Sequence, residues 1–409
     1  MPHPDSLQEC YSVLAINAGS SSIKFSLFDT GNPPQRLLDG AIDAIGAAAS
    51  CFHVTGKAAF SRRFPISDHV TAVRVLADWL GEHRLADRLT AIGHRVVYGG
   101  TAFQATQLVS PALIDAMFQA SSYDCEHLPQ ERLLIETLRH LFPAAAHVVC
   151  FDSAFHSLMP KLASMLPIPR KFHDAGVVRS GFHGLSCAFM MRELGRLAGQ
   201  GAANGKVVLA HLGSGCSMTA VEQGLSRDTS MGLTPAGGMM MASRSGEVDP
   251  GLGWRLLREH GVSPAQFNHM VHHDAGLKGV SGISGDLRVL LEKEASHPGA
   301  AEAVAMFCYQ ARKTLCAMTG ALEGLDTLVF AGGVGEHLAV IRSRICAGLA
   351  FLGIELDPEQ NALHAQVIST RGSRVTVRVM QTDEQWVIAH EVGELLGWPR
   401  PGAQAGGAQ

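Results

Sequence analysis

Short apolar runs rich in β-branched residues recur along the chain, each bounded by glycine, proline or polar residues, as is typical of strands. These runs cover residues 12–16, 23–28, 147–151, 206–210, 326–331 and 374–380. Between them, apolar residues recur at helical spacing within 73–80 and 134–141, and the alanine-rich stretch 299–325 contains no proline, which favours a helix. The alternation of strands and helices predicts an α/β fold. We expect glycine- and alanine-rich 199–206 to form a surface loop, and the tail 401–409 to be disordered.

Length and composition limit the number of domains and the kinds of partner. The chain has 409 residues, 46% of them hydrophobic, which favours two domains. A net charge of -4 and a pI near 6.6 argue against a nucleic-acid partner. The first seventeen residues do not resemble a secretory signal, and no apolar run approaches the roughly 20 residues that span a bilayer. We therefore expect a soluble, cytoplasmic protein with no membrane contact, and its nine cysteines, which form no C-x-x-C pair, to be reduced.

A weak internal repeat links the two halves of the chain. Aligning Gly19 with Gly213 superimposes "AINAGSSS" (15–22) on "LAHLGSGC" (209–216), so that each strand ends in a polar residue and a turn of small residues. Such turns let backbone N–H groups converge on an anion, which is the chemistry of phosphate binding. A single such turn is more often an ordinary hairpin, but two of them favour a ligand clamped by two lobes. Neither a Walker loop nor a G-x-G-x-x-G fingerprint is present, since "GQGAANGKV" and "FAGGVGEH" both fail the required spacing.

Charged residues stand in apolar or glycine-rich surroundings at several points. Arg95 lies in the middle of a strand-like segment, His183 between glycines and Arg244 in a loop. Arginine suits carboxylate or phosphate oxygens, although a structural ion pair explains a single arginine equally well. Asp152 follows a strand at the end where open α/β sheets bind ligands. A carboxylate such as Glu384 with the amide of Asn17 suffices for Mg²⁺, which keeps several waters; either acid alone could equally be a helix cap.

Together these motifs closely resemble those of the acetate kinases, within the acetate and propionate kinase family of the actin-like ATPase superfamily. The resemblance runs from about Val13 to Gly397 and rests on motifs in family order: "INAGSSSIKFSLFD", "GHRVVYGG", "FDSAFH", "GFHG", "HLGSGCS", "DTSMGLTP", "SRSGEVDPG", "GVSGISGDLR", "FAGGVGEH" and "TDEQWVIA". It implies a two-lobed, ribonuclease H-like fold with duplicated mixed sheets flanked by helices and the active site in the cleft between the lobes. The N-terminal lobe would be 1–153 completed by the helix 386–400, and the nucleotide-binding lobe 154–385. A homodimer is also implied.

The resemblance also assigns roles to individual residues. Asn17 and Glu384 would hold Mg²⁺, or Mn²⁺ in its place, and Lys24 would lie near the nucleotide phosphates. Arg95 and Arg244 would bind the carboxylate and the transferring phosphoryl group, His183 would stabilise charge on its equatorial oxygens, and Asp152 would be the catalytic aspartate. Because a carboxylate substrate is already ionised at pH 7 and needs no general base, we expect Asp152 to orient an arginine or the waters of the metal.

Two further sets of residues are implied to bind substrates. Those that would hold ATP or ADP are His211, Leu212, Gly213, Ser214, Gly215, Asp286, Leu287, Arg288, Gly332, Gly333, Val334, Gly335 and Glu336. Those that would line the apolar part of the carboxylate site are Val97, Phe182 and Pro235.

Departures from the family pattern leave the substrate open. "CEHLP" (125–129) keeps His127 and Pro129 but places Glu126 where the family lines its methyl pocket, and a buried carboxylate there would be unfavourable. Ser214 and His337 replace two asparagines near the nucleotide, and Ser180 and Cys187 replace a tyrosine and a histidine.

We expect reversible phosphoryl transfer between ATP and acetate, by direct in-line transfer. The alternatives are a propionate or other short-chain carboxylate kinase, a nucleotide-binding ATPase of the same superfamily without an acyl acceptor, and a degenerate member that only binds nucleotide.

Overall fold

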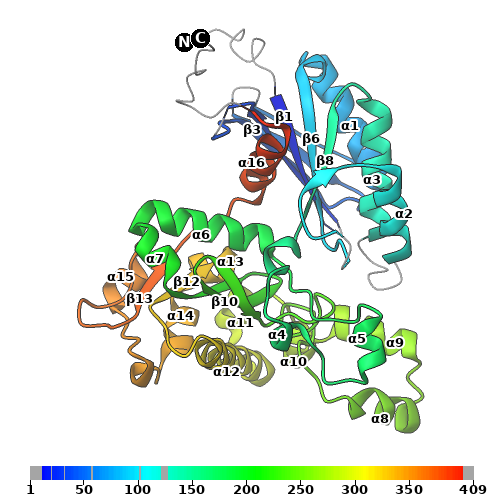
Figure 1. Cartoon of the computed structure of the whole chain (residues 1–409). Coiled ribbons are helices and arrows are strands. Elements are labelled where there is room, and N and C mark those ends of the chain that lie inside the picture. Colours follow the sequence, from blue (N-terminus) through cyan, green and yellow to red (C-terminus); the bar gives the residue numbers. More distant parts are fainter. Residues whose placement is uncertain are drawn as a thin grey trace. The chain divides into compact units, whose positions relative to one another are not determined.

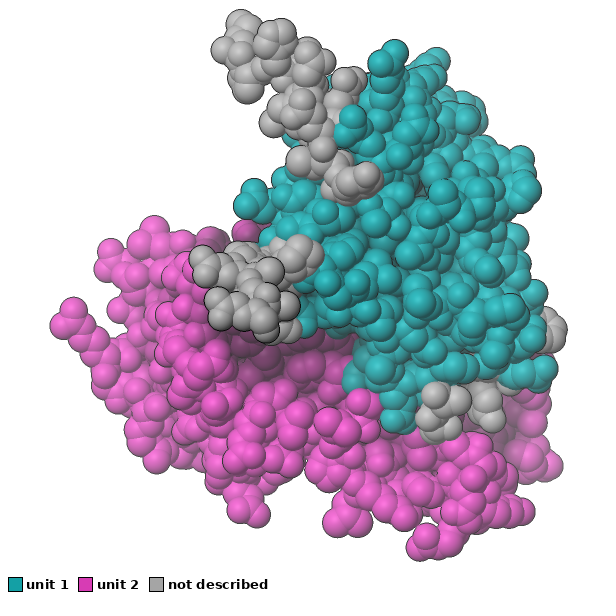
Figure 2. Space-filling model, turned by 45° about the horizontal axis from the view of Figure 1, so that its top comes forward, with its two compact units in different colours: residues 1–154, 383–409 teal, residues 155–382 magenta. Residues whose placement is uncertain are grey.

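The computed structural model describes residues 12–19, 21–31, 33–56, 59–100, 103–120 and 128–398. The chain divides into two compact units, which Figure 1 shows as ribbons and Figure 2 in separate colours. Unit 1 combines residues 1–154 with 383–409, and unit 2 consists of residues 155–382. The chain returns to unit 1 at Asp383, whereas the sequence placed the return at residue 386. Asp383 belongs with the last helix because its side chain caps that helix by accepting a hydrogen bond from Trp386 N. The predicted tail 401–409 lies outside the described residues.

Unit 1 is built on an eight-stranded mixed sheet of order β5-β4-β3-β2-β1-β6-β8-β7. Its strands are β1 (Ser12–Ala18), β2 (Ile23–Asp29), β3 (Arg36–Asp43), β4 (Ser50–Gly56), β5 (Phe60–Phe64), β6 (Leu89–Val96), β7 (Gln107–Leu108) and β8 (Ala146–Phe151). Strands β1 to β5 form an antiparallel meander, whereas β1, β6 and β8 are parallel. The carboxyl ends of these three parallel strands therefore meet at one edge of the sheet.

Helices cover both faces of this sheet. They are α1 (His69–Glu82), α2 (Pro111–Ala120), α3 (Leu128–Leu141) and α16 (Glu384–Leu396), with a 3₁₀ turn η2 (Ala86–Arg88). On one face, apolar residues of α1 and α3 such as Leu76 and Leu138 enter the core of the sheet. On the other face α16 packs against β1, β2 and β6 (Figure 1). The packing of α16 requires Gly93 in β6, because a Cβ atom there would lie 2.4 Å from Ile388 Cγ2.

Unit 2 repeats the central topology of unit 1 in a five-stranded sheet of order β11-β10-β9-β12-β13. Its strands are β9 (Lys206–Leu212), β10 (Cys216–Glu222), β11 (Leu225–Thr229), β12 (Thr327–Ala331) and β13 (Thr376–Val379). Strands β9 to β11 are an antiparallel meander and β9, β12 and β13 are parallel, as β1 to β3 and β1, β6 and β8 are in unit 1. The repeat around Gly19 and Gly213 thus reflects two sheets of the same order, which is the duplicated, two-lobed actin-like ATPase fold.

The helices of unit 2 range from short turns to the 24-residue α12. They are α4 (Lys161–Ser164), α5 (Arg170–Asp174), α6 (Gly184–Ala198), α7 (Gln200–Asn204), α8 (Gly251–His260), α9 (Pro264–His269), α10 (Gly276–Ser281), α11 (Leu287–Lys293), α12 (Pro298–Ala321), α13 (Gly332–His337), α14 (Ala339–Cys346) and α15 (Pro358–Ala362). The remaining short turns are η3 (Ala154–His156), which crosses the boundary between the units, η4 (Met270–Asp274), a π-helical turn, and η5 (Ala350–Leu352).

All six predicted strands and the three predicted helices are confirmed, with ends that shift by a few residues. Two local predictions were wrong. The segment 199–206 is not simply a loop, because it contains α7, and Arg95 lies next to the end of β6 rather than in the middle of a strand. The second correction matters for function, because it brings Arg95 to the edge where β1 and β8 also end. Within the described part of the chain, no helix has the length and apolar character needed to cross a membrane.

Candidate functional site

Three of the predicted site residues of unit 1 lie at the edge where β1, β6 and β8 end. Asn17 is near the end of β1, Arg95 near the end of β6, and Asp152 directly follows β8. The register explains this arrangement, because Ile16 pairs with His94 and Arg95 pairs with Cys150 across the parallel strands. Lys24 stands opposite Asn17 on β2 and is exposed to solvent.

Arg95 and Asp152 form a buried ion pair. The guanidinium donates from Nε (3.2 Å) and Nη2 (2.5 Å) to Asp152 Oδ2, and its Nη1 lies 3.5 Å from the carbonyl oxygen of Ala18. Burial would lower the pKa of Arg95, but the carboxylates of Asp152 and Glu384 outweigh it and raise the pKa. Arg95 is therefore a permanent cation, and the fully buried Asp152 fixes its direction.

Asn17 and Glu384 join β1 to the first turn of α16. Asn17 Nδ2 donates a hydrogen bond of 2.6 Å to Glu384 Oε2, so residues 367 positions apart in the sequence are brought together. Both side chains carry hard oxygen donors of the kind that Mg²⁺ takes in proteins. The negative charge of Glu384 also raises the pKa of Arg95. The Asn17–Glu384 pair therefore interacts with the ion pair of Arg95 and Asp152.

Glu131 in α3 is a site residue that the sequence reasoning missed. Its buried carboxylate accepts the backbone N–H of Val97 at 3.1 and 3.2 Å, and its charge contributes to the raised pKa of Arg95. A signal was present, because Glu131 lies three and seven residues before Leu134 and Leu138, on the apolar face of the helix. A carboxylate on that face must be buried with a partner.

In unit 2, His183, His211 and Arg244 gather around the turn between β9 and β10. His183 adopts a left-handed conformation with φ 59° at the start of α6, its Nδ1 lies 3.0 Å from Ser217 Oγ, and its ring centroid lies 4.4 Å from that of His211. A Cβ atom on Gly215 would lie 3.3 Å from His183 Nε2 and 3.6 Å from Arg244 Nη1. Because Gly215 has no side chain, the backbone of this turn lies next to the imidazole of His183 and the guanidinium of Arg244.

The predicted apolar residues of unit 2 are held by the same framework. Arg244 Nη1 donates to the carbonyl oxygen of Pro235 at 3.4 Å. The carbonyl of Phe182, which is buried, accepts a hydrogen bond of 3.0 Å from His156 Nε2, and His156 Nδ1 lies 2.9 Å from Ser226 Oγ. Burial lowers the pKa of His156 to about 4, so this histidine is a neutral structural residue. In unit 1, Val97 is buried beside Glu131.

A cavity of about 470 Å³ in unit 2 brings together three separate predicted segments. Gly213 and Ser214 come from the β9–β10 turn, Asp286–Arg288 from the start of α11, and Gly333 and Val334 from α13. Gly332 allows α13 to start close to β9, because a Cβ atom there would lie 2.7 Å from the carbonyl oxygen of Leu212. Further lining comes from His337, which was expected near the nucleotide, and from four residues that were not predicted: Ala242, Leu277, Gly285 and Leu338.

Not every predicted nucleotide-binding residue is among those that line this cavity. Glu336 lines a different cavity of unit 2 together with His337, and the residues that line the 470 Å³ cavity do not include His211, Leu212, Gly215, Gly332 or Gly335. Glu126 and His127 lie outside the described residues, so their predicted effect on the carboxylate site stays a prediction.

Comparison with known proteins finds similarity over nearly the whole chain. Residues 12–390 match the model of the Acetokinase family. The acetate kinase of Rhodopseudomonas palustris (strain TIE-1) is 39% identical over 94% of this chain and 98% of its own, and acetate kinase 1 of Lactococcus lactis is 38% identical over 93% and 98%.

Solved structures are similar too. A propionate kinase from Francisella tularensis has a TM-score of 0.87 and 31% identity, covering 93% of this chain and 98% of its own. The acetate kinase of Porphyromonas gingivalis has a TM-score of 0.85 and 30% identity, covering 94% and 99%.

Proposed function

Because this chain belongs to the acetokinase family, we propose that it transfers the γ-phosphoryl group of ATP directly and reversibly to acetate, giving acetyl phosphate and ADP. The enzyme is a phosphotransferase with a carboxyl group as acceptor. One observation carries the assignment: His183 and Arg244 lie beside Gly215, in the same turn whose Gly213 and Ser214 line the 470 Å³ cavity. A nucleotide in that cavity would direct its phosphates along the turn toward these side chains.

The reaction needs positive charge more than covalent catalysis. Phosphoryl transfer spreads negative charge over the equatorial oxygens, and enzymes accelerate it mainly by positioning and electrostatic stabilisation. In our proposal His183 and Arg244 donate to the transferring group, and Arg95 binds the acceptor carboxylate. Lys24, exposed on β2, would neutralise charge on the nucleotide phosphates.

We propose that Asp152 orients Arg95 and moves no proton. Acetate has a pKa of roughly 4 to 5, by analogy with Asp and Glu, so it is already a nucleophile at neutral pH. Both hydrogen bonds from Arg95 end on one oxygen of Asp152, which supports this role. Glu131, which holds the backbone at Val97, would be a further positioning residue.

We propose Mg²⁺ as the metal, with Mn²⁺ as an alternative, held by Asn17 and Glu384. Among the described residues, no group of three or more His, Cys, Asp or Glu side chains is placed to hold a metal ion. Mg²⁺ takes one or two protein oxygens and keeps its waters, so the donor set of an amide and a carboxylate fits it. When bound, the ion would neutralise phosphate charge.

Propionate is the nearest alternative acceptor, since one extra methylene changes binding by only about 1 to 3 kcal/mol. A propionate kinase is among the similar solved structures, so the family likeness does not choose between the two acids. We place acetate first because the apolar residues that the resemblance assigns to the acceptor site, Val97, Phe182 and Pro235, have not given way to smaller ones that would admit a longer acid.

We also propose a cytoplasmic homodimer. Large apolar side chains of unit 2 are exposed in the single chain, including Leu158, Leu162 and Trp254 at 70%, 90% and 64%. Association with a second copy would remove such surface from water.

Hydroxylamine trapping tests the proposed reaction. The protein would be incubated with ATP, Mg²⁺ and formate, acetate, propionate or butyrate in turn, and acyl phosphate captured as the hydroxamate. We expect acetohydroxamate above all others. A clear preference for propionate would replace acetate as the substrate, and no hydroxamate with any acid would overturn the kinase assignment.

A further inference from the structure

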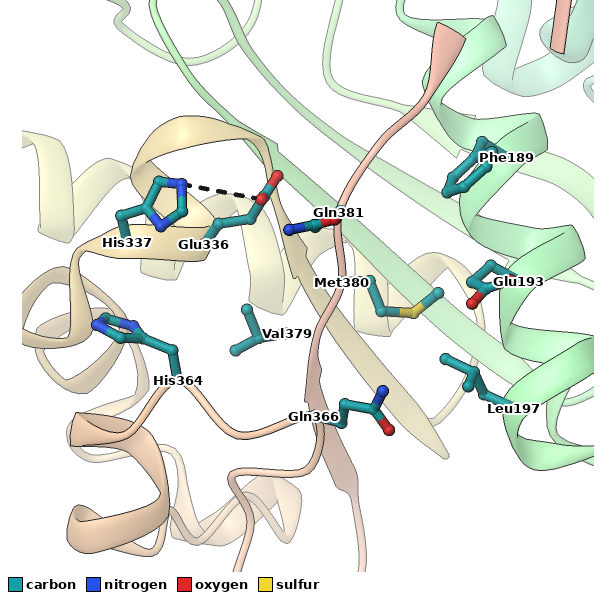
Figure 3. A pocket seen from close by; sticks show the side chains of 10 residues that line it. All are labelled: Phe189, Glu193, Leu197, Glu336, His337, His364, Gln366, Val379, Met380 and Gln381. Atoms are coloured by element: carbon teal, nitrogen blue, oxygen red, sulfur yellow. Dashed lines mark ion pairs between the residues drawn. The ribbon is translucent and has the colours of Figure 1, made fainter. Parts of the chain in front are cut away.

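A second cavity of about 410 Å³ lies within unit 2, at the carboxyl ends of β12 and β13 (Figure 3). Met380 and Gln381 directly follow β13, and Glu336 belongs to α13, which follows β12. Glu193 of α6 provides another wall. The carboxyl ends of parallel strands are where open α/β sheets bind ligands, yet none of the proposed reaction steps uses this cavity.

The charge of the lining favours a cation. Glu193 and Glu336 contribute two carboxylates, and the lining includes neither lysine nor arginine. Arg196, outside the lining, pairs with Glu193, so the charge that favours a cation is that of Glu336. The side chain of Glu336 is only 14% exposed; its Oε1 accepts the backbone N–H of Gly332 at 3.1 Å, and its Oε2 lies 4.0 Å from His337 Nε2 (Figure 3). Burial raises the pKa of Glu336, which indicates that the contacts around this carboxylate compensate its charge incompletely.

Four apolar side chains of the lining suit an aliphatic body, and its remaining polar members are His337, His364, Gln366 and Gln381. Phe189, Leu197, Val379 and Met380 supply apolar surface. Figure 3 shows Met380 directed toward the side of Phe189 and Leu197, and the amide of Gln381 directed toward Glu336. On the same side as Met380, the carboxylate of Glu193 is held by two hydrogen bonds of 2.7 and 2.6 Å from Arg196.

We propose that this cavity binds a small aliphatic amine, with its ammonium group on Glu336 and its carbon chain on the apolar wall formed by Val379 and Met380. An anion such as acetate or phosphate would meet the carboxylate of Glu336, and the lining contains no lysine or arginine that would attract it. The nucleotide cavity differs, because its carboxylate, Asp286, is paired with Arg288 of the same lining.

Helix α13 couples the two cavities. Gly333 and Val334 line the nucleotide cavity, Glu336 lines the amine cavity, and His337 lines both. The helix has six residues, and Glu336 holds its first residue through the bond to Gly332 N. An ammonium group that attracts the Glu336 carboxylate therefore acts on the backbone beside the nucleotide, and the amine and ADP must change each other's affinity by the same factor.

Calorimetric titration of the full chain tests amine binding without ATP or acetate, so that outcome is independent of the kinase assignment, whereas the arm with ADP rests on the proposed nucleotide cavity. The probes are butylamine and 1,4-diaminobutane, with 1,4-butanediol as the neutral control and succinate as the anionic control. We expect saturable binding of the amines alone, and an amine dissociation constant that shifts severalfold when ADP is present. Equal binding of amine and diol, or no amine binding, would overturn the site, and an unchanged constant with ADP would overturn the coupling.

Variants locate the binding. Glu336→Gln should weaken amine binding tenfold or more, and Gln381→Lys should abolish it by placing the protein's own ammonium group beside Glu336. Glu259→Gln is the control, because it makes the same change of a glutamate on a helix of unit 2, there a partner of Arg255, but lies outside the cavity. Glu259→Gln should bind amines as the parent does; unchanged binding by Glu336→Gln would contradict the proposal.

Discussion

Replacing Asp152 with asparagine separates an orienting role from a proton-transfer role. The parent carboxylate accepts two hydrogen bonds from Arg95, of 3.2 and 2.5 Å, on one oxygen. Hydrogen bonds to charged groups contribute about 1.5 to 3 kcal/mol each. Asparagine keeps an acceptor oxygen but loses the charge, so we expect a loss of about 2 kcal/mol in the positioning of Arg95. That loss corresponds to roughly a 30-fold fall in kcat.

The pH dependence of this fall is the discriminating observation. If Asp152 only directs Arg95, the ratio of parent to variant kcat, measured by hydroxamate formation, stays constant between about pH 6 and 9, because acetate is ionised throughout that range. Recovery of the variant's activity with rising pH would refute the orienting role, since hydroxide would then be replacing a lost base.

A matched variant controls for the loss of an ion pair as such. Glu294→Gln removes the carboxylate that accepts from Arg344 Nη1 and Nη2 at 2.6 and 2.9 Å, in unit 2 and outside the residues assigned to either substrate. Its kcat should stay within about twofold of the parent. Thermal unfolding of both variants shows whether the fold persists, which matters because breaking a buried ion pair can cost about 3 to 5 kcal/mol.

Three further outcomes follow from the contacts. Asn17→Ala, which loses the 2.6 Å bond to Glu384, should raise the Mg²⁺ concentration needed for half-maximal turnover about tenfold with the unfolding temperature little changed; an unchanged Mg²⁺ requirement would remove Asn17 from the metal site. Gly215→Ala should lower kcat about tenfold or more, because the added Cβ atom would lie 3.3 Å from His183 Nε2. If the variant instead has the kcat of the parent, His183 and Arg244 do not act on the phosphoryl group. Burial lowers the pKa of His156 to about 4, so this histidine is neutral in the folded protein but takes up a proton in the unfolded chain below about pH 6.5. The free energy of unfolding should therefore fall as the pH is lowered from about 6.5 to 4, by up to about 3 kcal/mol. This pH dependence should be weaker in His156→Gln.

Local sequence patterns predicted the parts of the fold that depend on neighbouring residues. The hairpins at Gly19 and Gly213 follow from apolar runs interrupted by small residues, and both are antiparallel strand pairs in the structure. The order of the strands could not be read in this way, because it depends on pairings such as that of β6 with β8, whose partners lie more than fifty residues apart.

The missed site residues have the same cause. Glu131 acts on Val97 across 34 positions and His156 acts on Phe182 across 26, so neither role is visible until the chain is folded. For Glu336, the motif "FAGGVGEH" placed α13 correctly beside the nucleotide cavity, but it could not show that this side chain lines the other one. Side-chain direction on so short a helix is fixed by packing, which motif spacing does not contain.

The central claim is that a carboxylate oxygen of acetate attacks the γ-phosphorus of ATP. Acetate labelled with ¹⁸O in both oxygens would be supplied with ATP and Mg²⁺, and the products followed by ³¹P NMR. The account predicts ADP and acetyl phosphate whose phosphorus carries one ¹⁸O from acetate in the bridging position. Release of AMP, or acetyl phosphate with no ¹⁸O on phosphorus, would contradict it.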